Sequence, residues 1–473
     1  MIVDLNIQKN QNIPNLLYDA CIIGAGAAGI TIANELGASG LKVALIEAGS
    51  TEFTEESQDI YEGKITGDPY LPLDVTRLRY LGGSTNHWGG MCRTFEKIDF
   101  DRSYLGEEYK WPIKFNEIYK YLEKACEILE ISNNFEYLDA NLENVKPIRY
   151  QQSLVRFKDK YQSQLSNSPN ITLFINSNLQ DINGDNEMIK TIKVQSYTNN
   201  LLTIRAKKFV LAMGGIENSR YLLWFKKKYG GKYFDPTTPI GEYWMEHPVF
   251  TLGKAFVKNS VYVKQYYSVK EKPQKINKIL GCSFRMLGAS SSETKQMLKN
   301  LICVAPNLGN KIAKLLDKRI LCGIKFRASW EQSPAKTSSV SLLSETDRFG
   351  ISKANLTWSK NALDRKTIKQ SINVFNEWFL KDNIGRIKLD DWLLNDLDYP
   401  ENDELGGHHH MGGTRMSDNR RFGVVDKNCK VFGSNNFYVA GSSIYVTGGY
   451  QNPTLGIVQF SLRLSEHLKS MLV

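Results

Sequence analysis

The feature that most constrains the fold is a glycine-rich turn near the start of the chain. Residues 18–50 read YDACIIGAGAAGITIANELGASGLKVALIEAGS, an apolar run followed by Gly24, Gly26 and Gly29 and then by a stretch that can be helical. The first glycine allows a tight turn, the second lets backbone approach a pyrophosphate, and the third lets the helix pack on the strand. A second apolar run ends in Glu47, whose carboxylate is placed to bind ribose hydroxyls. The segment therefore predicts dinucleotide binding.

Later segments distinguish FAD from NAD, which share this arrangement. A contiguous NAD-binding domain would continue with strand and helix repeats, but residues 77–92 read RLRYLGGSTNHWGGMC, a glycine and aromatic mixture typical of a loop. Residues 207–224 (KKFVLAMGGIENSRYLLW) and 435–468 are similar to further pieces of the same nucleotide-binding sheet. A site assembled from the start, middle and end of the chain suits the long, extended FAD.

Together these segments resemble the glucose-methanol-choline (GMC) oxidoreductases, flavoenzymes that oxidise alcohols. The resemblance covers most of the chain, including the glycine turn, the loop LGGSTNHWGG and GEYWMEHP at 241–248. It is most specific at 406–468, where HHMGGTRM, GVVD, FYVAGSS and GGYQNPTL follow one another in the family's order. The NHW detail is similar to the branch that contains pyranose oxidase and related sugar dehydrogenases. The second family signature appears here only as GGIENSRYLLW.

The resemblance implies an α/β fold (α+β overall) with two domains. One is a Rossmann-like FAD-binding domain assembled from discontinuous segments, and the other is a substrate domain whose antiparallel sheet covers the flavin ring. We assign residues 1–90, 171–249 and 401–473 to the FAD-binding domain, and 91–170 and 250–400 to the substrate-binding domain.

Local patterns within the substrate-binding part agree with that implication. Residues 325–358 read as three strands separated by Pro, Ser, Asp and Gly turns, which is the pattern of a meander. Residues 364–380 follow with helical spacing of their apolar positions.

Three consecutive histidines, His408, His409 and His410, stand between glycine pairs. In an extended HHHM segment, His408 and His410 point to one side and His409 to the other. Adjacent histidines in a strand do not converge on a metal ion, and no cysteine or acid cluster nearby supplies further ligands, so we predict no metal site. In the resembled family the catalytic histidine precedes the x-M-G of this motif, which corresponds to His409.

A neutral imidazole suits that role. Removing hydride from a carbinol carbon requires that the hydroxyl proton is taken at the same time, and imidazole is matched to this near neutral pH. The resemblance therefore implies that His409 is the base, with His410 packed elsewhere. The alternative is a core histidine bonded to backbone.

Asn452 precedes Pro453, Thr454 and a helical pattern, so we expect Asn452 at the N-cap and Pro453 at the first helical position. The positive end of this helix suits the negative charge that reduced flavin develops near its pyrimidine edge. The family places its second substrate-contacting residue at this position. Asn452 is therefore expected to donate a hydrogen bond to the substrate oxygen as well.

His87 raises a question about how the flavin is attached. In the resembled branch, the histidine before tryptophan is bonded covalently to the flavin 8-methyl carbon, and His87 with Trp88 matches that placement. The alternative is a histidine packed beside a non-covalent flavin, and the sequence leaves both open.

Other segments are expected to shape the cofactor site through their backbone. Residues that follow the apolar run FYVA can offer amides to the pyrophosphate, and the loop before His87 is expected to act similarly near the flavin: Gly441, Ser442, Gly82, Gly83 and Ser84. His247, in MEHP, is expected to be structural.

These residues predict FAD-dependent oxidation of an alcohol, of a sugar or polyol, to an aldehyde or ketone. The resemblance implies that hydride passes to flavin N5 and that the electrons then go to oxygen or another oxidant. The alternatives are another FAD-dependent oxidation, such as amine oxidation or NAD(P)H-dependent hydroxylation, and a non-catalytic flavoprotein scaffold.

Charge and composition exclude some partners. The net charge of +10 comes largely from lysine runs such as FKKKYGGK, which we interpret as solvated faces, although they leave an anionic substrate open. No nucleic-acid-binding motif is present. The chain has no apolar run long enough for a membrane helix and no apolar block for a signal peptide, so we expect a cytoplasmic protein without membrane association. Seven scattered cysteines predict free thiols.

Overall fold

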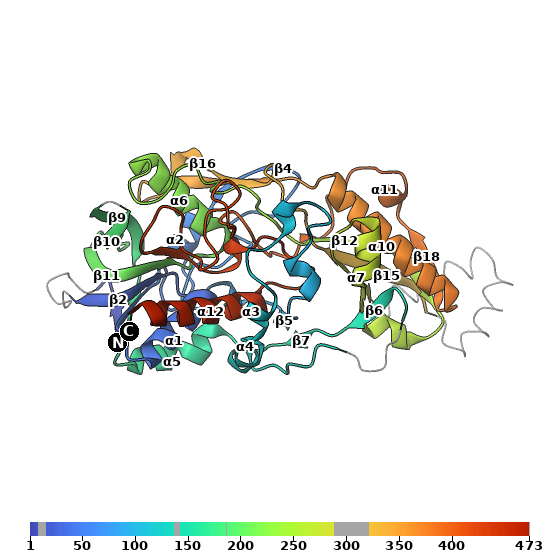
Figure 1. Ribbon diagram of the computed structural model, residues 1–473, viewed down its shortest axis with the longest axis horizontal. Coiled ribbons are helices and arrows are strands. Elements are labelled where there is room, and N and C mark those ends of the chain that lie inside the picture. The colour runs from blue at the N-terminus through green and yellow to red at the C-terminus, as the bar shows by residue number, and fades with distance from the viewer. Residues whose placement is uncertain (8–15, 137–141, 186, 288–320, 473) are drawn as a thin grey trace.

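The computed structural model describes residues 1–7, 16–136, 142–185, 187–287 and 321–472. Two large sheets lie towards opposite ends of the long axis of the molecule (Figure 1), each with its own hydrophobic core. The predicted α/β class is confirmed.

The first sheet has eight strands in the order β1-β8-β3-β2-β11-β10-β9, and β20 pairs with β11. Strands β1, β8, β3, β2, β11 and β20 pair in parallel, whereas β9 and β10 extend the sheet in antiparallel fashion. The strands are β1 (Ile2–Asp4), β2 (Leu17–Ile23), β3 (Val43–Ile46), β8 (Ile171–Ile175), β9 (Asn178–Asp185), β10 (Met188–Gln195), β11 (Leu201–Leu211) and β20 (Phe437–Val439).

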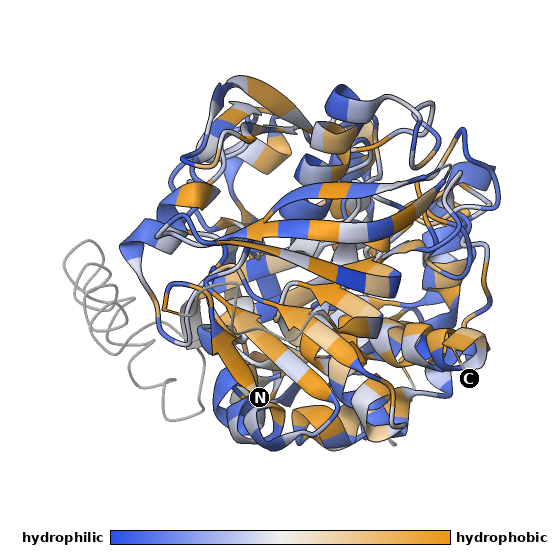
Figure 2. Ribbon diagram, turned by 90° about the vertical axis from the view of Figure 1, so that its left-hand side faces the viewer, coloured by the Kyte–Doolittle hydropathy of each residue, from blue (hydrophilic) through white to orange (hydrophobic). Residues whose placement is uncertain are grey.

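Burial follows the direction of pairing. The parallel strands β3 and β8 are buried at every position, because helices and loops cover both faces, while β10 alternates buried with exposed residues. Hydrophobic and hydrophilic residues also alternate along strands that face the viewer in Figure 2. Because the parallel strands are buried along their length, polar groups are expected at the strand ends.

Helices cover this sheet. Helix α1 (Ala27–Ala38) follows β2 and packs against α12 (Thr454–Leu472), and α6 (Gly214–Tyr229) follows β11. Other α-helices of the described chain, which do not all lie on this sheet, are α2 (Glu55–Gln58), α3 (Asn116–Tyr119), α4 (Leu122–Leu129), α5 (Phe157–Asn167), α7 (Glu271–Asn277) and α11 (Asp391–Leu394). The predicted strand, glycine turn and helix units at the start and middle of the chain are thus confirmed, and they share one sheet.

The second sheet is antiparallel throughout, in the order β18-β12-β15-β14-β13-β6, with β19 beside β12. Its strands are β6 (Val145–Ile148), β12 (Pro248–Val257), β13 (Tyr266–Val269), β14 (Cys282–Leu287), β15 (Leu321–Trp330), β18 (Gly385–Leu389) and β19 (Leu405–Gly406). Helix α10 (Ala362–Lys381) packs on this sheet and buries Ile368, Ile372, Phe375 and Phe379, which confirms the helix predicted at 364–380.

The predicted meander at 325–358 is wrong in its pairing. Its three strands exist, as β15, β16 (Ser339–Thr346) and β17 (Ser352–Trp358), but β15 belongs to the seven-stranded sheet. Strand β16 pairs with β17, and β17 pairs in parallel with β4 (Gly63–Gly67) in a separate three-stranded sheet. Turn residues mark where strands end, whereas a partner almost 300 residues away leaves no local signal. A two-stranded sheet joins β5 (Met91–Cys92) and β7 (Gln151–Gln152).

The strands of the eight-stranded sheet all fall within the segments assigned to the FAD-binding domain, 1–90, 171–249 and 401–473. Strand β4 of the same segments pairs with β17 instead, so the two predicted domains share a small sheet. The division itself stays a prediction.

Two further properties concern the described part of the chain. Five cysteines there are free and buried: Cys21, Cys92, Cys126, Cys282 and Cys429. None of its helices is long and apolar enough to cross a membrane.

The packing of α1 on the glycine turn generates a stability prediction. A β-carbon at Gly29 would lie 1.8 Å from the carbonyl oxygen of Gly24, which is backbone and cannot give way. We expect Gly29→Ala to lower the free energy of unfolding by about 1–3 kcal/mol, although helix propensity alone would favour alanine by about 1 kcal/mol. Thermal unfolding of the two proteins measures the difference.

Gly26→Ala is the matched control. A β-carbon at Gly26 meets no protein atom within 4 Å, so after removal of flavin from all three proteins this variant should unfold near the wild-type temperature. Equal unfolding temperatures for all three proteins would contradict the steric explanation.

Candidate active site

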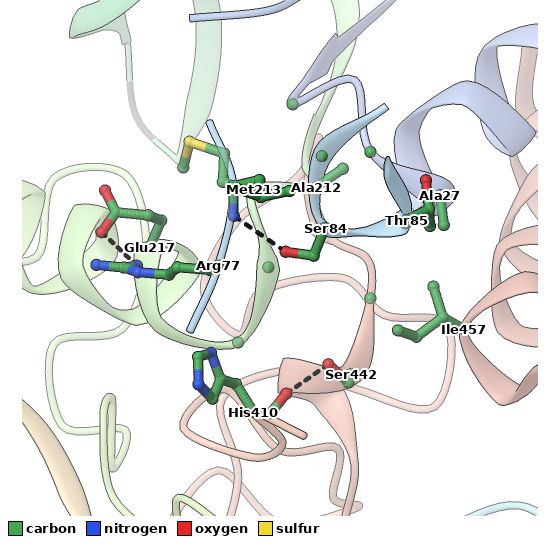
Figure 3. Close-up of a pocket in the computed structure, with 18 of the residues that line it drawn as sticks. Ala27, Arg77, Ser84, Thr85, Ala212, Met213, Glu217, His410, Ser442 and Ile457 are labelled. Atoms are coloured by element: carbon green, nitrogen blue, oxygen red, sulfur yellow. Dashed lines mark hydrogen bonds and ion pairs between the residues drawn. The ribbon is translucent and has the colours of Figure 1, made fainter. Parts of the chain in front are cut away.

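A cavity of about 410 Å³ opens at the carboxyl edge of the parallel strands. Its wall includes the glycine turns after β2, β11 and β20, at Gly24, Gly214 and Gly441. Because these strands are parallel neighbours, their carboxyl ends and the amides that follow meet in one place. Figure 3 shows residues from the start, middle and end of the chain around this space. The volume is typical of a small-molecule site.

The predicted cofactor-binding residues lie on this wall, except for Gly29 and Gly82. These two lie behind it: Gly29 packs against the turn, and the N–H of Gly82 donates to the carbonyl of Ala25 at 2.8 Å. The residues on the wall are Gly24, Gly26, Glu47, Gly83, Ser84, His87, Gly441, Ser442, Pro453 and Thr454.

The glycine turns leave room for a bound group. β-Carbons built at Gly26, Gly214 and Gly441 meet no atom within 4 Å, whereas at Gly24 the β-carbon would lie 2.4 Å from the carbonyl oxygen of Ala212. Gly24 therefore serves the close packing of two turns, and the other three leave backbone bare towards the cavity. Bare amides after parallel strands fit the pyrophosphate of a dinucleotide such as FAD.

Glu47 ties the end of β3 to the glycine turn. Its two carboxylate oxygens accept hydrogen bonds from the N–H of Ala25 at 3.0 Å and of Gly49 at 2.9 Å. Burial raises the pKa of Glu47, and the two backbone bonds oppose that rise. Each oxygen keeps a further lone pair, so the carboxylate can also accept from ribose hydroxyls.

A buried ion-pair network fixes the loop at 77–90. The Arg77 guanidinium lies 2.8 Å from one oxygen of Glu217 (Figure 3), and Arg220 lies 2.9 Å from the other. The hydroxyl of Ser84 accepts from the N–H of Leu78 at 3.2 Å, so this side chain already holds the loop together.

His87 is exposed at the rim of the cavity. Its N–H donates to the carbonyl of Ser84 at 3.3 Å, and no hydrogen bond engages its imidazole within the described chain. The indole N–H of Trp88 donates to the carbonyl of Val155 at 2.9 Å and so anchors this position. The ring of His87 is therefore free to contact a bound group.

The histidine triplet does not form the predicted extended segment. His408 has φ of +58°, in the left-handed region, which turns the chain and removes the expected alternation of side chains. All three histidines line the cavity. Among the described residues, no group of three His, Cys, Asp or Glu side chains could hold a metal ion.

His410 packs on the inner side of the loop, against Tyr70 and Trp244, with its Nε2 3.1 Å from the Tyr70 hydroxyl. Its carbonyl accepts from the hydroxyl of Ser442 at 2.6 Å (Figure 3). The Ser442 side chain thus holds the histidine loop.

The buried carboxylate of Glu246 organises the backbone of the same loop. It accepts from the N–H groups of His247 at 2.7 Å, His409 at 2.8 Å and Gly407 at 3.2 Å, and from the hydroxyl of Tyr70. Burial raises the pKa of Glu246 to about 7, and the bonds from Tyr70 and the backbone oppose this rise.

His247 and His409 contact each other directly. Their Nδ1 atoms lie 2.8 Å apart, and Nε2 of His247 lies 2.7 Å from the carbonyl oxygen of Gly449. Burial lowers the pKa of His247 to about 4. Burial, followed by the charges of His247 and the two flanking histidines, lowers the pKa of His409 well below its usual value. Both imidazoles are therefore neutral near pH 7; the unprotonated nitrogen of His409 has the lone pair that a proton acceptor needs, and burial makes it a weaker base than a free imidazole.

Sequence reasoning missed part of this arrangement. His247 was expected to be only structural, and Glu246 and Tyr70 carried no expectation. The available signal was an acid and a histidine side by side at the start of a buried strand, in MEHP. A charged side chain at such a position needs partners inside the protein.

The predicted helix start is wrong by one residue. Helix α12 begins at Thr454, and the carbonyl of Pro453, not of Asn452, accepts the first helical bond, from the N–H of Ile457 at 2.8 Å. Proline has no N–H to lose at the first positions, so it tolerates this place. Asn452 lies one residue earlier, on the cavity wall, and its carboxamide has no hydrogen-bond partner in the described chain.

Known proteins resemble this chain in part of its sequence and in its fold. Residues 334–460 match a family model described as GMC oxidoreductase. A pyridoxine 4-oxidase from Mesorbium loti has the same fold, with a TM-score of 0.62, 13% identity and coverage of 95% of this chain and 99% of its own. The sequence itself matches no curated protein.

Two further solved structures share the fold. A formate oxidase has a TM-score of 0.57 and 16% identity, over 97% of this chain and 99% of its own. An FAD-dependent oxidoreductase from Chaetomium thermophilum has a TM-score of 0.60 and 14% identity, over 96% and 99%. At these identities the likeness establishes the fold alone.

The buried carboxyl of Glu246 generates a pH prediction. Because its pKa is about 7 in the folded protein and about 4.3 when unfolded, the folded protein binds this proton more tightly. The contribution of Glu246 to the free energy of unfolding is fully present below about pH 4.3. It falls by about 3 kcal/mol as the pH rises to about 7. Glu246→Gln should remove this part of the slope in thermal unfolding measured across that pH window.

Asp364→Asn is the matched control, since burial also raises the pKa of Asp364 to about 7, at the start of α10. Both variants should flatten the pH dependence of stability. An unaltered slope in Glu246→Gln alone would show that this carboxyl titrates normally.

Proposed function

We propose that the chain is a GMC oxidoreductase, on the match of residues 334–460 to that family's model, and that it uses bound FAD to oxidise an alcohol to an aldehyde or ketone. The observation that carries the proposal is that His409 and Asn452 lie on the wall of the cavity that also contains the glycine turns and Glu47. Bound FAD would supply the acceptor for the hydride of the carbinol carbon. The remaining steps concern the protein's own residues.

His409 takes the hydroxyl proton. Its Nδ1 is engaged by His247, whereas Nε2 has no hydrogen-bond partner among the described residues. A neutral imidazole with one free nitrogen on a cavity wall is what a general base requires. Asn452 donates its amide to the substrate oxygen and so holds the hydroxyl near His409.

The cavity wall favours an uncharged alcohol. Its cations are Arg77, which pairs with Glu217, and Arg79, which donates to Tyr197 at 2.7 Å and to Asn178 at 2.8 Å. The described wall thus offers no unengaged cation to an anionic substrate. We propose a sugar or polyol, on the likeness of the NHW loop. The shared fold of a pyridoxine 4-oxidase adds pyridoxine to the alcohols to be tested.

His409→Ala tests the base. We expect the variant to keep its flavin but to be reduced by alcohol about 10²- to 10⁴-fold more slowly, the usual contribution of a general base. Anaerobic stopped-flow bleaching with a panel of sugars, polyols and pyridoxine measures this rate. Admission of air afterwards shows whether oxygen is the acceptor.

The control for this experiment is His467→Ala, the same substitution at a half-buried ring beside Tyr438 in α12. This control should be reduced at the wild-type rate. Reduction of His409→Ala at that rate would remove the base assignment. Flavin that no alcohol bleaches, or that NAD(P)H reduces, would favour a scaffold or a hydroxylase instead.

His87 is the residue we propose to lie against the flavin 8-methyl edge, and acid precipitation decides whether a bond joins them. With a covalent link, the yellow colour and a mass increment stay with the peptide that contains His87, and both disappear in His87→Ala. Complete release of flavin from the wild-type protein would leave the non-covalent alternative.

A further inference from the structure

We propose that His247 is a positioning residue for the reaction. Its Nε2–H donates to the Gly449 carbonyl, so its Nδ1 accepts a hydrogen bond from His409. This bond keeps the His409 proton on Nδ1 and leaves Nε2 of His409 unprotonated towards the cavity. This inference rests on the proposed function in one respect only, the use of His409 as the base. The tautomer itself follows from the hydrogen bonds of this chain.

The first step is the bond between His247 and Gly449. A carbonyl oxygen only accepts, so His247 Nε2, 2.7 Å away, carries a proton. The position of Gly449 is held by its surroundings: its φ is +61°, and a β-carbon there would lie 2.0 Å from the side-chain oxygen of Gln451. The Gln451 amide in turn donates to Asp99 at 2.9 Å.

The second step is the charge of His247. Its ring is fully buried, and the carboxylate of the adjacent Glu246 accepts from the backbone N–H of His247, while the hydrogen-bond partners of the imidazole are His409 and the Gly449 carbonyl. A cationic ring there would lack a counter-charge, and burial accordingly lowers the pKa of His247 to about 4. The ring is therefore neutral, and because Nε2 is protonated, Nδ1 is an acceptor.

The third step transfers this constraint to His409. Two unprotonated nitrogens would repel each other at the observed 2.8 Å, so His409 Nδ1 must carry the hydrogen of that bond. Neutral His409 then has a bare Nε2. When Nε2 takes the hydroxyl proton, both nitrogens of His409 are protonated, Nδ1–H still donates to neutral His247, and no proton leaves the pair.

Backbone hydrogen bonds hold His247 and His409 beside each other. The N–H groups of His247 and His409 both donate to Glu246. Beyond each histidine, Met245 and Met411 exchange two backbone bonds of 2.8 Å and 3.0 Å. The contact between the rings is therefore part of the paired start of β12 and not a chance approach of two flexible side chains.

The direct test is the tautomer of each histidine in the flavin-loaded protein. The chain has only six histidines, so two-bond proton–nitrogen correlation spectra of the protein with ¹⁵N-labelled histidine can be assigned by single substitutions. We expect the Nε2–H form for His247 and the Nδ1–H form for His409 at neutral pH. An Nε2–H form of His409 would overturn the inference, whatever the enzyme does.

Variants at His247 connect the tautomer with the rate. His247→Phe keeps a ring but removes the acceptor, so His409 should populate both tautomers, and flavin reduction should slow about 10- to 100-fold, the loss seen when the hydrogen-bond partner of a metal-bound histidine is removed. His247→Asn places a carboxamide oxygen near the lost Nδ1 and should restore most of the Nδ1–H signal and of the rate. Flavin content and unfolding temperature check that both variants fold.

The outcomes separate this inference from the proposed function. If the wild-type protein has the predicted tautomers but its His409→Ala variant is reduced at the wild-type rate, His247 still sets the tautomer of His409, and His409 is not the base. If the His247→Phe variant has the wild-type rate and an intact Nδ1–H signal, His247 is not a positioning residue, and the base assignment of His409 is unaffected. If His247→Phe does not fold, the wild-type spectra decide the matter alone.

Discussion

The parallel alignment of β2, β11 and β20 is the constraint on which the site depends. These strands come from the start, middle and end of the chain, and their register places Ile23, Leu211 and Val439 side by side. Each strand is then followed by a glycine with positive φ, at Gly24, Gly214 and Gly441. Because hydrogen bonds between strands and burial on both faces fix this edge, the loops that follow have little freedom in where they begin. The cavity is a consequence of strand pairing and not of any one loop.

The second feature is the buried carboxylate of Glu246, which accepts hydrogen bonds from several separate segments of the chain. Glu246 is desolvated, which is costly unless its lone pairs are filled, and here three backbone N–H groups and the Tyr70 hydroxyl fill them. All of these donors belong to segments that must meet for the histidine loop to face the cavity. An incompletely folded loop would leave some of these lone pairs without donors, so burial of Glu246 costs more in an incorrect arrangement than in the correct one. A polar network of this kind specifies one conformation where apolar contacts alone would permit several.

The comparisons show how little sequence such a fold requires. Solved structures with 13% to 16% identity superpose over nearly the whole chain. Most positions of the two cores only need to be apolar and of suitable size, which many sequences satisfy. The positions where backbone lies against backbone have no such latitude: at Gly24 and Gly29 a β-carbon would lie 2.4 Å and 1.8 Å from a carbonyl oxygen. Glycines at such close contacts are therefore less replaceable than the apolar positions of the two cores.

The sequence by itself determined the features that depend on neighbours along the chain: the strand, turn and helix around Gly24, the carboxylate at Glu47, the amphipathic helix over 364–380 and the positions of β15, β16 and β17. It also placed His409 and Asn452 in segments that reach the cavity wall. Only the tertiary structure decided which strands pair, so that β17 meets β4, and how the histidine loop turns at His408. It likewise brought His247 to His409, 162 residues away in sequence. Periodicity and turn chemistry are local, whereas strand partners and contacts between distant side chains are selected by the packing of the whole chain.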